Sequence, residues 1–132
     1  MSQNVEALRR AAEAVKKNDP SILDELLDPE VVWEVRETAP DLMGTYHGID
    51  EVRGWFAKWE QAWEAWDWNH PEMTAHENKV IARMHLWGRG RNSGIEIEDD
   101  IWQVWSFRNG KVIHYRDFAN REEALAAAGL HE

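Results

Sequence analysis

The strand-like segment from Ile95 to Phe107 carries polar residues where hydrophobic ones would be expected. Side chains alternate between the two faces of a strand, and the odd positions of this segment are otherwise almost all hydrophobic. Asp99 and Gln103 interrupt that series. A polar group on a buried face destabilises the fold unless it is paired or solvated in a cavity. We therefore expect both side chains to face a cavity.

Two further carboxylates are expected at the same cavity. Asp117 shares one face of the last predicted strand with Tyr115, and Glu34 lies in the β-rich segment 31–35. Desolvation raises the pKa of a carboxylate on an apolar wall, which suits it to proton transfer near neutral pH. Neighbouring carboxylates also push their pKa values apart, so that one holds a proton while another abstracts one. Asp117, Glu34 and Asp99 are therefore candidate catalytic acid/base residues.

Each of these polar residues also has a structural interpretation. Asp117 would pair with an arginine, Glu34 would point to solvent beyond the strand end, and Gln103 would cap backbone groups. In the catalytic interpretation, Gln103 and Tyr115 donate hydrogen bonds to a developing enolate oxygen. The sequence alone leaves both interpretations open.

Aromatic residues are the most unusual feature of the composition, with nine tryptophans in 132 residues. Core and interface packing accounts for most aromatic residues in proteins. The alternative is an aromatic wall around a ligand, and several tryptophans recur at helical spacing between Val52 and Trp66. Under this alternative the substrate-binding residues are Gln103, Tyr115, Trp105, Trp59, Trp63, Met84 and Tyr46.

These side chains must be positioned by helices early in the chain and strands late in it. Helical periodicity predicts helices over 3–18, 21–27 and 52–66, with a strand over 31–35 between them. Period-two alternation then predicts strands over 66–74, 79–90, 95–107 and 111–118, before a short terminal helix that opens at Asn120. This order predicts one α+β domain over residues 1–132. We expect a strongly bent antiparallel sheet with helices on its concave face.

The outer face of that sheet is expected to carry His85, Trp87, Trp102 and Val104. Such a face is too hydrophobic to be left bare, and a second copy of the chain is the simplest cover. We therefore predict a homodimer through this face.

The remaining composition excludes several classes of protein. A net charge of −10 opposes nucleic-acid binding, which needs a basic surface. No hydrophobic run approaches the ~18 residues of a membrane span, so we expect no membrane partner and a cytoplasmic location. The chain has no cysteine, and no histidine pair has metal-site spacing. We expect neither a metal nor another cofactor.

A set of short motifs covers nearly the whole chain in a familiar order. It comprises the helix at Val5–Leu8, the segments Asp19–Leu27 and Asp28–Trp33, Tyr46–Val52, Gln103–Val112 and Glu123–Leu125. Together these motifs resemble the SnoaL-like polyketide cyclases and ketosteroid isomerase, within the nuclear transport factor two-like superfamily. The resemblance implies a cone-shaped α+β fold around an apolar pocket.

The resemblance also implies roles for single residues. Asp117 stands where the polyketide cyclases have their acid/base aspartate, and Glu34 falls where ketosteroid isomerase has its carboxylate base. Gln103 falls where that isomerase has a protonated carboxyl group, and Ala12 where it has a tyrosine donor.

Two functional classes follow from these observations. The first is a cofactor-independent enzyme that moves a proton next to a carbonyl in a small hydrophobic molecule, by isomerisation, cyclisation or a related step. The second is a non-catalytic dimeric ligand-binding module, natural or designed. The polar residues expected at the pocket favour the enzyme, and one fold hosts both classes.

Overall fold

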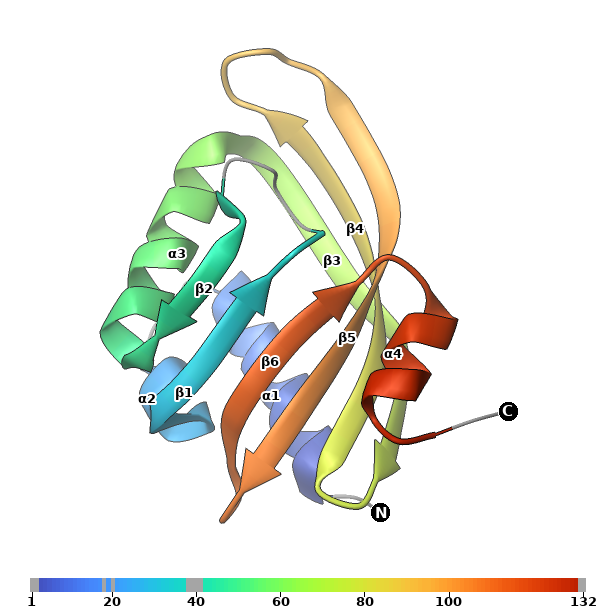
Figure 1. Ribbon diagram of the computed structural model, residues 1–132. Helices are drawn as coiled ribbons and strands as arrows, with labels where there is room; N and C mark the ends of the chain where they lie inside the picture. The colour runs from blue at the N-terminus through green and yellow to red at the C-terminus, as the bar shows by residue number, and fades with distance from the viewer. Residues whose placement is uncertain (1–2, 18, 20, 38–41, 131–132) are drawn as a thin grey trace.

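Four helices and six strands make up the computed structural model of the chain (Figure 1), which describes residues 3–17, 19, 21–37 and 42–130. In chain order they are α1 (Gln3–Lys16), α2 (Ile22–Leu26), β1 (Leu27–Val35), β2 (Gly44–His47), α3 (Gly48–Ala62), β3 (Trp63–His76), β4 (Lys79–Gly90), β5 (Glu96–Arg108), β6 (Lys111–Phe118) and α4 (Arg121–Ala127). Among the described residues, no helix is long and apolar enough to cross a membrane.

The six strands form one sheet in the order β2-β1-β6-β5-β4-β3. Neighbouring strands are antiparallel except β1 and β6, which are parallel. The predicted α+β class is therefore confirmed, but the sheet is mixed rather than purely antiparallel. Hairpins join β3 to β4, β4 to β5 and β5 to β6, whereas β1 and β6 lie far apart in the chain, so no short turn imposes an antiparallel arrangement.

Helices cover both faces of the sheet. In Figure 1, α1 passes behind the sheet and α4 lies in front of it. We call the face that carries α1, α2 and α3 the inner face, and the face that carries α4 the outer face. The main hydrophobic core lies on the inner face, between these three helices and the strands.

Helix α4 corrects the expectation that a partner subunit covers Val104. Ala124 and Ala128 pack against Val104 and its outer-face neighbours Ile81 and Phe118, and Val104 is only 4% exposed. Trp102 packs at the edge of the same cluster. The chain therefore buries this part of the outer face itself. Dimerisation stays a prediction, resting on the parts of the face that α4 leaves uncovered.

Helix α3 ends at Ala62, one turn before the predicted Trp66. Arg91, in the turn between β4 and β5, supplies the reason. Its side chain donates to the carbonyl oxygens of Gln61 at 3.1 Å and Trp63 at 2.9 Å, and its backbone N–H donates to that of Ala62 at 3.0 Å. These donors satisfy carbonyls that a helix end leaves free. The capping residue lies about thirty positions along the chain, beyond the reach of a local pattern.

Candidate ligand-binding site

An apolar cavity lies between the inner face of the sheet and helices α1, α2 and α3. The centre of a water molecule can occupy about 70 Å³ of it. The polar lining side chains, apart from indole N–H groups, are His70, Gln103 and Tyr115. Seven aromatic rings form much of the wall, namely Trp33, Trp55, Phe56, Trp59, Trp68, Trp105 and Tyr115.

The aromatic rings contact one another around the cavity. The Trp33 ring stacks on Tyr115 with centroids 4.0 Å apart, and meets the Trp105 ring edge-on at 5.4 Å. On the helix side, the Trp55 and Trp59 rings stack at 5.6 Å. Such contacts stabilise an aromatic cluster beyond its buried area. The wall is therefore a connected array rather than a set of isolated rings.

Gln103 is the polar centre of this wall and is 4% exposed. Its Nε2 donates to the Tyr115 hydroxyl oxygen at 3.2 Å and contacts the Met84 sulfur at 3.6 Å. Its Oε1 accepts from the Trp105 indole N–H at 3.2 Å. Gln103, Tyr115, Trp105, Met84 and Trp59 all line the cavity, at the place the sequence analysis expected.

His70 on β3 also lines the cavity, and the sequence analysis overlooked it. The pKa of His70 is lowered to about 4, mainly by burial and also by the nearby positive charges of Arg9 and Lys16, which together outweigh a hydrogen bond with Gln103 that raises it. The imidazole is therefore neutral near pH 7. Alternation offered a signal, because Trp66, Trp68 and His70 follow one another at period two.

Tyr115 is held in its neutral form. Burial raises its pKa well above the ordinary value, and the charge of Asp117 adds to this effect, while the hydrogen bond from Gln103 opposes it. Because Gln103 already donates to the phenol oxygen, the hydroxyl proton of Tyr115 is available to an acceptor in the cavity.

A surface groove adjoins the cavity between α1 and β3. It is lined by Arg9, Glu13 and Lys16 and shares Ala12, Trp68 and His70 with the cavity. Arg9 donates to the carbonyl oxygen of His70 at 3.3 Å, and Lys16 to that of Trp68 at 3.1 Å. The groove therefore meets the cavity at His70. Beside it, Arg9 and Lys16 link α1 to β3 through these hydrogen bonds.

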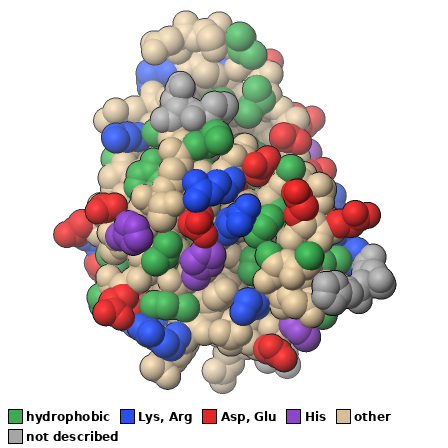
Figure 2. All heavy atoms as spheres, viewed as in Figure 1, with side chains coloured by type: hydrophobic (Ala, Val, Ile, Leu, Met, Phe, Trp, Pro, Cys, Tyr) green, Lys and Arg blue, Asp and Glu red, His purple; other side chains and the backbone are tan. Residues whose placement is uncertain are grey.

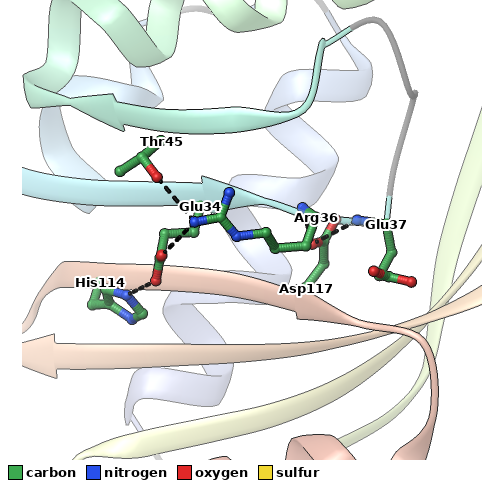
Figure 3. Close-up of polar contacts among 6 residues, drawn as sticks. All are labelled: Glu34, Arg36, Glu37, Thr45, His114 and Asp117. Carbon is green, nitrogen blue, oxygen red and sulfur yellow. Dashed lines mark hydrogen bonds and ion pairs between the residues drawn. The ribbon is translucent and has the colours of Figure 1, made fainter.

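Asp117 has a different position from the one expected. It is fully buried, and its Oδ1 accepts from the backbone N–H groups of Arg36 at 2.6 Å and Glu37 at 3.1 Å (Figure 3). It does not belong to the described residues that line the cavity. Asp117 lies on the inward side of β6, as its alternation with Tyr115 predicted. Its carboxylate, however, caps the backbone just beyond the end of β1 and does not reach the cavity.

Glu34 lies on the outer face of the sheet, not at the cavity. Its inward-facing neighbours are Trp33 and Val35, both buried. The Glu34 carboxylate contacts His114 Nε2 at 2.6 Å and Arg36 Nη2 at 3.0 Å (Figure 3). Burial raises the pKa of Glu34, but the hydrogen bonds and charges of His114 and Arg36 outweigh it, so the pKa is lowered. Figure 2 shows basic, acidic and histidine side chains gathered on this outer face.

Asp99 is exposed, although it has the inward parity of Gln103. The β4–β5 hairpin extends beyond the other strands at the top of Figure 1, and residues 91–100 near its tip are all exposed. Ile95 and Ile97, on the same side, are 65% and 41% exposed. Asp99 therefore lies in solvent, where its side chain accepts from the backbone N–H of Asp100 at 2.8 Å.

Trp63 and Tyr46 are also displaced from the expected wall. Because α3 ends early, Trp63 begins β3, and its ring lies over Gly88, where an added Cβ would come within 2.7 Å of it. Tyr46 sits on the edge strand β2 and donates to the carbonyl oxygen of Leu42 at 2.7 Å. Neither is among the described residues that line the cavity.

The chemistry available in the cavity differs from that of a carboxylate site. Its titratable side chains, among the residues described, are His70 and Tyr115. Among the residues that the structure describes, no group of three side chains of the types that bind metals forms a cluster. The polar groups that the wall can supply are therefore one neutral imidazole, one neutral phenol and one amide.

Several solved structures have a similar fold. An NTF2-like protein of unknown function from Burkholderia pseudomallei K96243 is 23% identical, with 96% of this chain and 97% of that one covered and a TM-score of 0.81. TerC, co-crystallized with polyporic acid, is 19% identical over 98% of both chains, with a TM-score of 0.79. A proposed SnoaL-like polyketide cyclase from Jannaschia sp. CCS1 is 17% identical over 96% of this chain and 89% of that one, with a TM-score of 0.77. At this level of identity they show the fold.

No curated protein matches the chain. A family model described as a SnoaL-like domain, however, matches residues 8–115. This range begins at Leu8 and ends at Tyr115, so it contains every residue assigned to the cavity wall. The chain therefore belongs to the family of SnoaL-like domains.

Proposed function

We propose that this domain binds a small, uncharged, mostly apolar cyclic molecule in the cavity, and that His70 moves a proton next to a carbonyl of that molecule. One observation carries the proposal. A neutral imidazole lines the same cavity as the Gln103 amide, and the other walls of this cavity are largely aromatic. Binding sites for small molecules are typically apolar, with a few polar groups that fix orientation.

The size of the cavity limits the ligand. A water needs roughly 10–15 Å³ of such space and occupies ~30 Å³ as liquid, so 70 Å³ corresponds to about five to seven waters. Replacing them leaves room for one or two fused rings. A larger ligand would require the aromatic side chains to move.

The proton transfer is balanced within the cavity. The neutral His70 nitrogen accepts a proton from the carbon beside the carbonyl, the C–H electron pair forms a C=C bond to the carbonyl carbon, and the π pair of the C=O bond moves to the oxygen. The resulting enolate oxygen accepts a hydrogen bond from the Tyr115 hydroxyl. Because the pKa of His70 is about 4, the imidazolium returns its proton readily, to the same carbon or to another one.

Solved structures of similar fold include a proposed cyclase and complexes with small organic molecules. The Jannaschia protein is described as a proposed polyketide cyclase, and TerC was crystallized with polyporic acid. A protein with a ketosteroid isomerase-like fold from Catenulispora acidiphila was crystallized in complex with trimethylamine. Small organic molecules are thus reasonable ligands to test on this chain.

The test uses 1-tetralone, a bicyclic ketone with exchangeable protons beside its carbonyl. We expect the protein to catalyse exchange of these protons with D₂O, followed by NMR of the ketone. The variant H70Q should lower the catalysed rate by roughly a hundredfold or more, whereas H85Q, a control on the outer face, should not. Catalysed exchange that H70Q leaves intact would contradict the role of His70.

Binding is tested separately from catalysis. Ala11 is buried and lines the cavity, whereas Ala7, one turn earlier on α1, does not. A11L should fill the cavity and abolish calorimetric binding of 1-tetralone, while A7L should retain it. If neither the protein nor its variants bind bicyclic ketones, the proposed ligand class is wrong.

A non-catalytic ligand-binding module is the second candidate function. Its supporting observation is that the three candidate carboxylates, Asp117, Glu34 and Asp99, all lie away from the cavity wall. This function predicts binding of 1-tetralone, loss of binding in A11L, and no catalysed exchange.

A further inference from the structure

The groove between α1 and β3 brings charged side chains to the edge of an otherwise apolar cavity. Its charged residues are Arg9, Glu13 and Lys16. The cavity itself, as far as its wall is described, is lined by no lysine, arginine, aspartate or glutamate. A ligand in the cavity therefore meets a full charge only where it extends into the groove.

The two cations of the groove differ in how far they are already paired. Lys16 forms an ion pair with Asp67 at 3.0 Å and also donates to the carbonyl oxygen of Trp68. Arg9 donates to the carbonyl oxygen of His70, and it forms no ion pair with a carboxylate in the part of the chain that the structure describes. A guanidinium has five N–H donors, so most of those of Arg9 remain free for a ligand. Arg9 is therefore the better candidate for binding an added anion.

The groove and the cavity meet at the residue to which Arg9 is linked. Ala12, Trp68 and His70 line both spaces. The Arg9 guanidinium lies 3.3 Å from the carbonyl oxygen of His70, and the proposed function places the carbon beside the ligand carbonyl at the His70 ring. A short side chain on that carbon would thus leave the cavity at His70 and enter the groove near Arg9.

We propose that the groove is a second binding subsite, in which Arg9 binds a carboxylate carried on a short side chain of the cyclic ligand. The planar guanidinium matches the two oxygens of a carboxylate. The uncharged ring lies in the cavity, whereas the carboxylate stays in the groove, where water reaches it. This inference rests on the binding half of the proposed function and extends its ligand from an uncharged ring to that ring with an acidic side chain.

The charge of the whole protein makes this proposal easy to distinguish from general attraction. The chain has a net charge of −10, which repels anions at long range. Glu13 adds a negative charge within the groove itself. A preference for an acid over an uncharged analogue of the same shape therefore requires a specific cationic partner at the site.

The experiment compares three ligands that share one bicyclic frame. They are 1-tetralone, its derivative with an acetic acid side chain at carbon 2, and the corresponding acetamide, which has nearly the same shape without the charge. We expect calorimetry at low salt to show the acid binding roughly three- to fivefold more tightly than the amide, the effect of one partly exposed ion pair. The preference should disappear in concentrated NaCl, because salt screens an exposed pair.

Matched variants on α1 identify the cation. R9Q should abolish the preference for the acid over the amide, whereas R10Q, at an exposed position outside the groove and the cavity, should retain it. E13Q should increase the preference, with E6Q as the exposed control outside the groove. Loss of the hydrogen bond from Arg9 to His70 would weaken the acid and the amide alike, so the ratio of their affinities isolates the ion pair.

The outcomes separate this inference from the proposed function. Equal affinity for the acid and the amide, with 1-tetralone still bound, overturns the subsite and leaves cavity binding intact. An equal loss of preference in R9Q and R10Q also overturns it, because the whole surface of α1 would then attract the acid. Binding of the acid alone, lost in R9Q, supports the subsite and contradicts an uncharged ligand. Failure of all three ligands to bind overturns the proposed function as well.

Discussion

Gln103 on β5 reaches diagonally across the sheet to Tyr115 on β6, and its amide N–H donates to the phenol oxygen at 3.2 Å. The same amide accepts from the Trp105 indole, so one side chain fixes two rings of the cavity wall. This arrangement also keeps the Tyr115 hydroxyl proton free for a ligand.

Replacing Gln103 by leucine should destabilise the protein because it leaves both partners buried and unpaired. We expect Q103L to lower the free energy of unfolding by roughly 1–3 kcal/mol, measured by urea denaturation. W105F loses one hydrogen bond while keeping an aromatic ring, so it should cost less. Equal stability of Q103L and the wild type would show that these hydrogen bonds contribute little.

Asp117 should be a structural residue rather than the base. Its carboxylate accepts two backbone N–H groups in a fully buried position. We expect D117A to lower the free energy of unfolding by about 3–6 kcal/mol, since each of the two hydrogen bonds to the carboxylate contributes ~1.5–3 kcal/mol. Ligand binding per folded molecule should stay near the wild-type value. A stable D117A protein that has lost catalysed exchange would restore Asp117 as the acid/base residue.

His70 should make the protein less stable in mild acid. Its pKa is 6.5 in the unfolded chain and about 4 in the fold, so between these values the unfolded state binds more protons. Stability contributed by His70 therefore rises with pH from 4 to 6.5 and is complete above 6.5. Over this pH range, the titration of His70 changes the free energy of unfolding by at most roughly 3 kcal/mol.

The comparison of H70Q with the wild type isolates this term. Unfolding curves from pH 4 to 7 should show a shallower rise of stability with pH in H70Q. H85Q should instead show a steeper rise of stability with pH. Hydrogen bonds to Asp100 and Glu98 raise the pKa of His85, so in the wild type His85 stabilises the fold at low pH and this stabilisation is lost as the pH rises. Identical slopes for H70Q and the wild type would mean that His70 titrates normally.

Homodimerisation is tested best at Trp87. Trp102 packs against the α4 cluster, so changing it would disturb the fold. Trp87 is only partly buried, and its indole donates to Glu96 at 3.2 Å. W87E should release monomer in sedimentation while leaving the unfolding midpoint nearly unchanged. A wild type that is monomeric at micromolar concentration would end the dimer prediction.

Side-chain alternation predicted which face of a strand each residue lies on, but it did not predict what covers that face. It placed Gln103 and Tyr115 inward correctly, because side-chain parity is a local property of a strand. Asp99 shares that parity but lies where the hairpin overhangs the sheet, and only the lengths of the neighbouring strands decide this. Parity alone could not distinguish a cavity wall from an exposed surface.

Glu34 and His70 show two other limits. Alternation from Val31 to Val35 puts Glu34 on the face opposite Trp33 and Val35, but the family resemblance, not alternation, was used to place it. His70 precedes Pro71 and an irregularity in the pairing of β3 with β4, between Asn69 and Glu72. The inward series that contains Trp68 and His70 therefore ends where the regular pattern of the strand is interrupted.

The most direct test of the account is a crystal structure with 1-tetralone. We predict that the two rings lie between Trp33, Trp59 and Trp105, with the carbonyl oxygen within hydrogen-bonding distance of the Tyr115 hydroxyl. A ligand bound only on the outer face, with the cavity unchanged, would contradict the account.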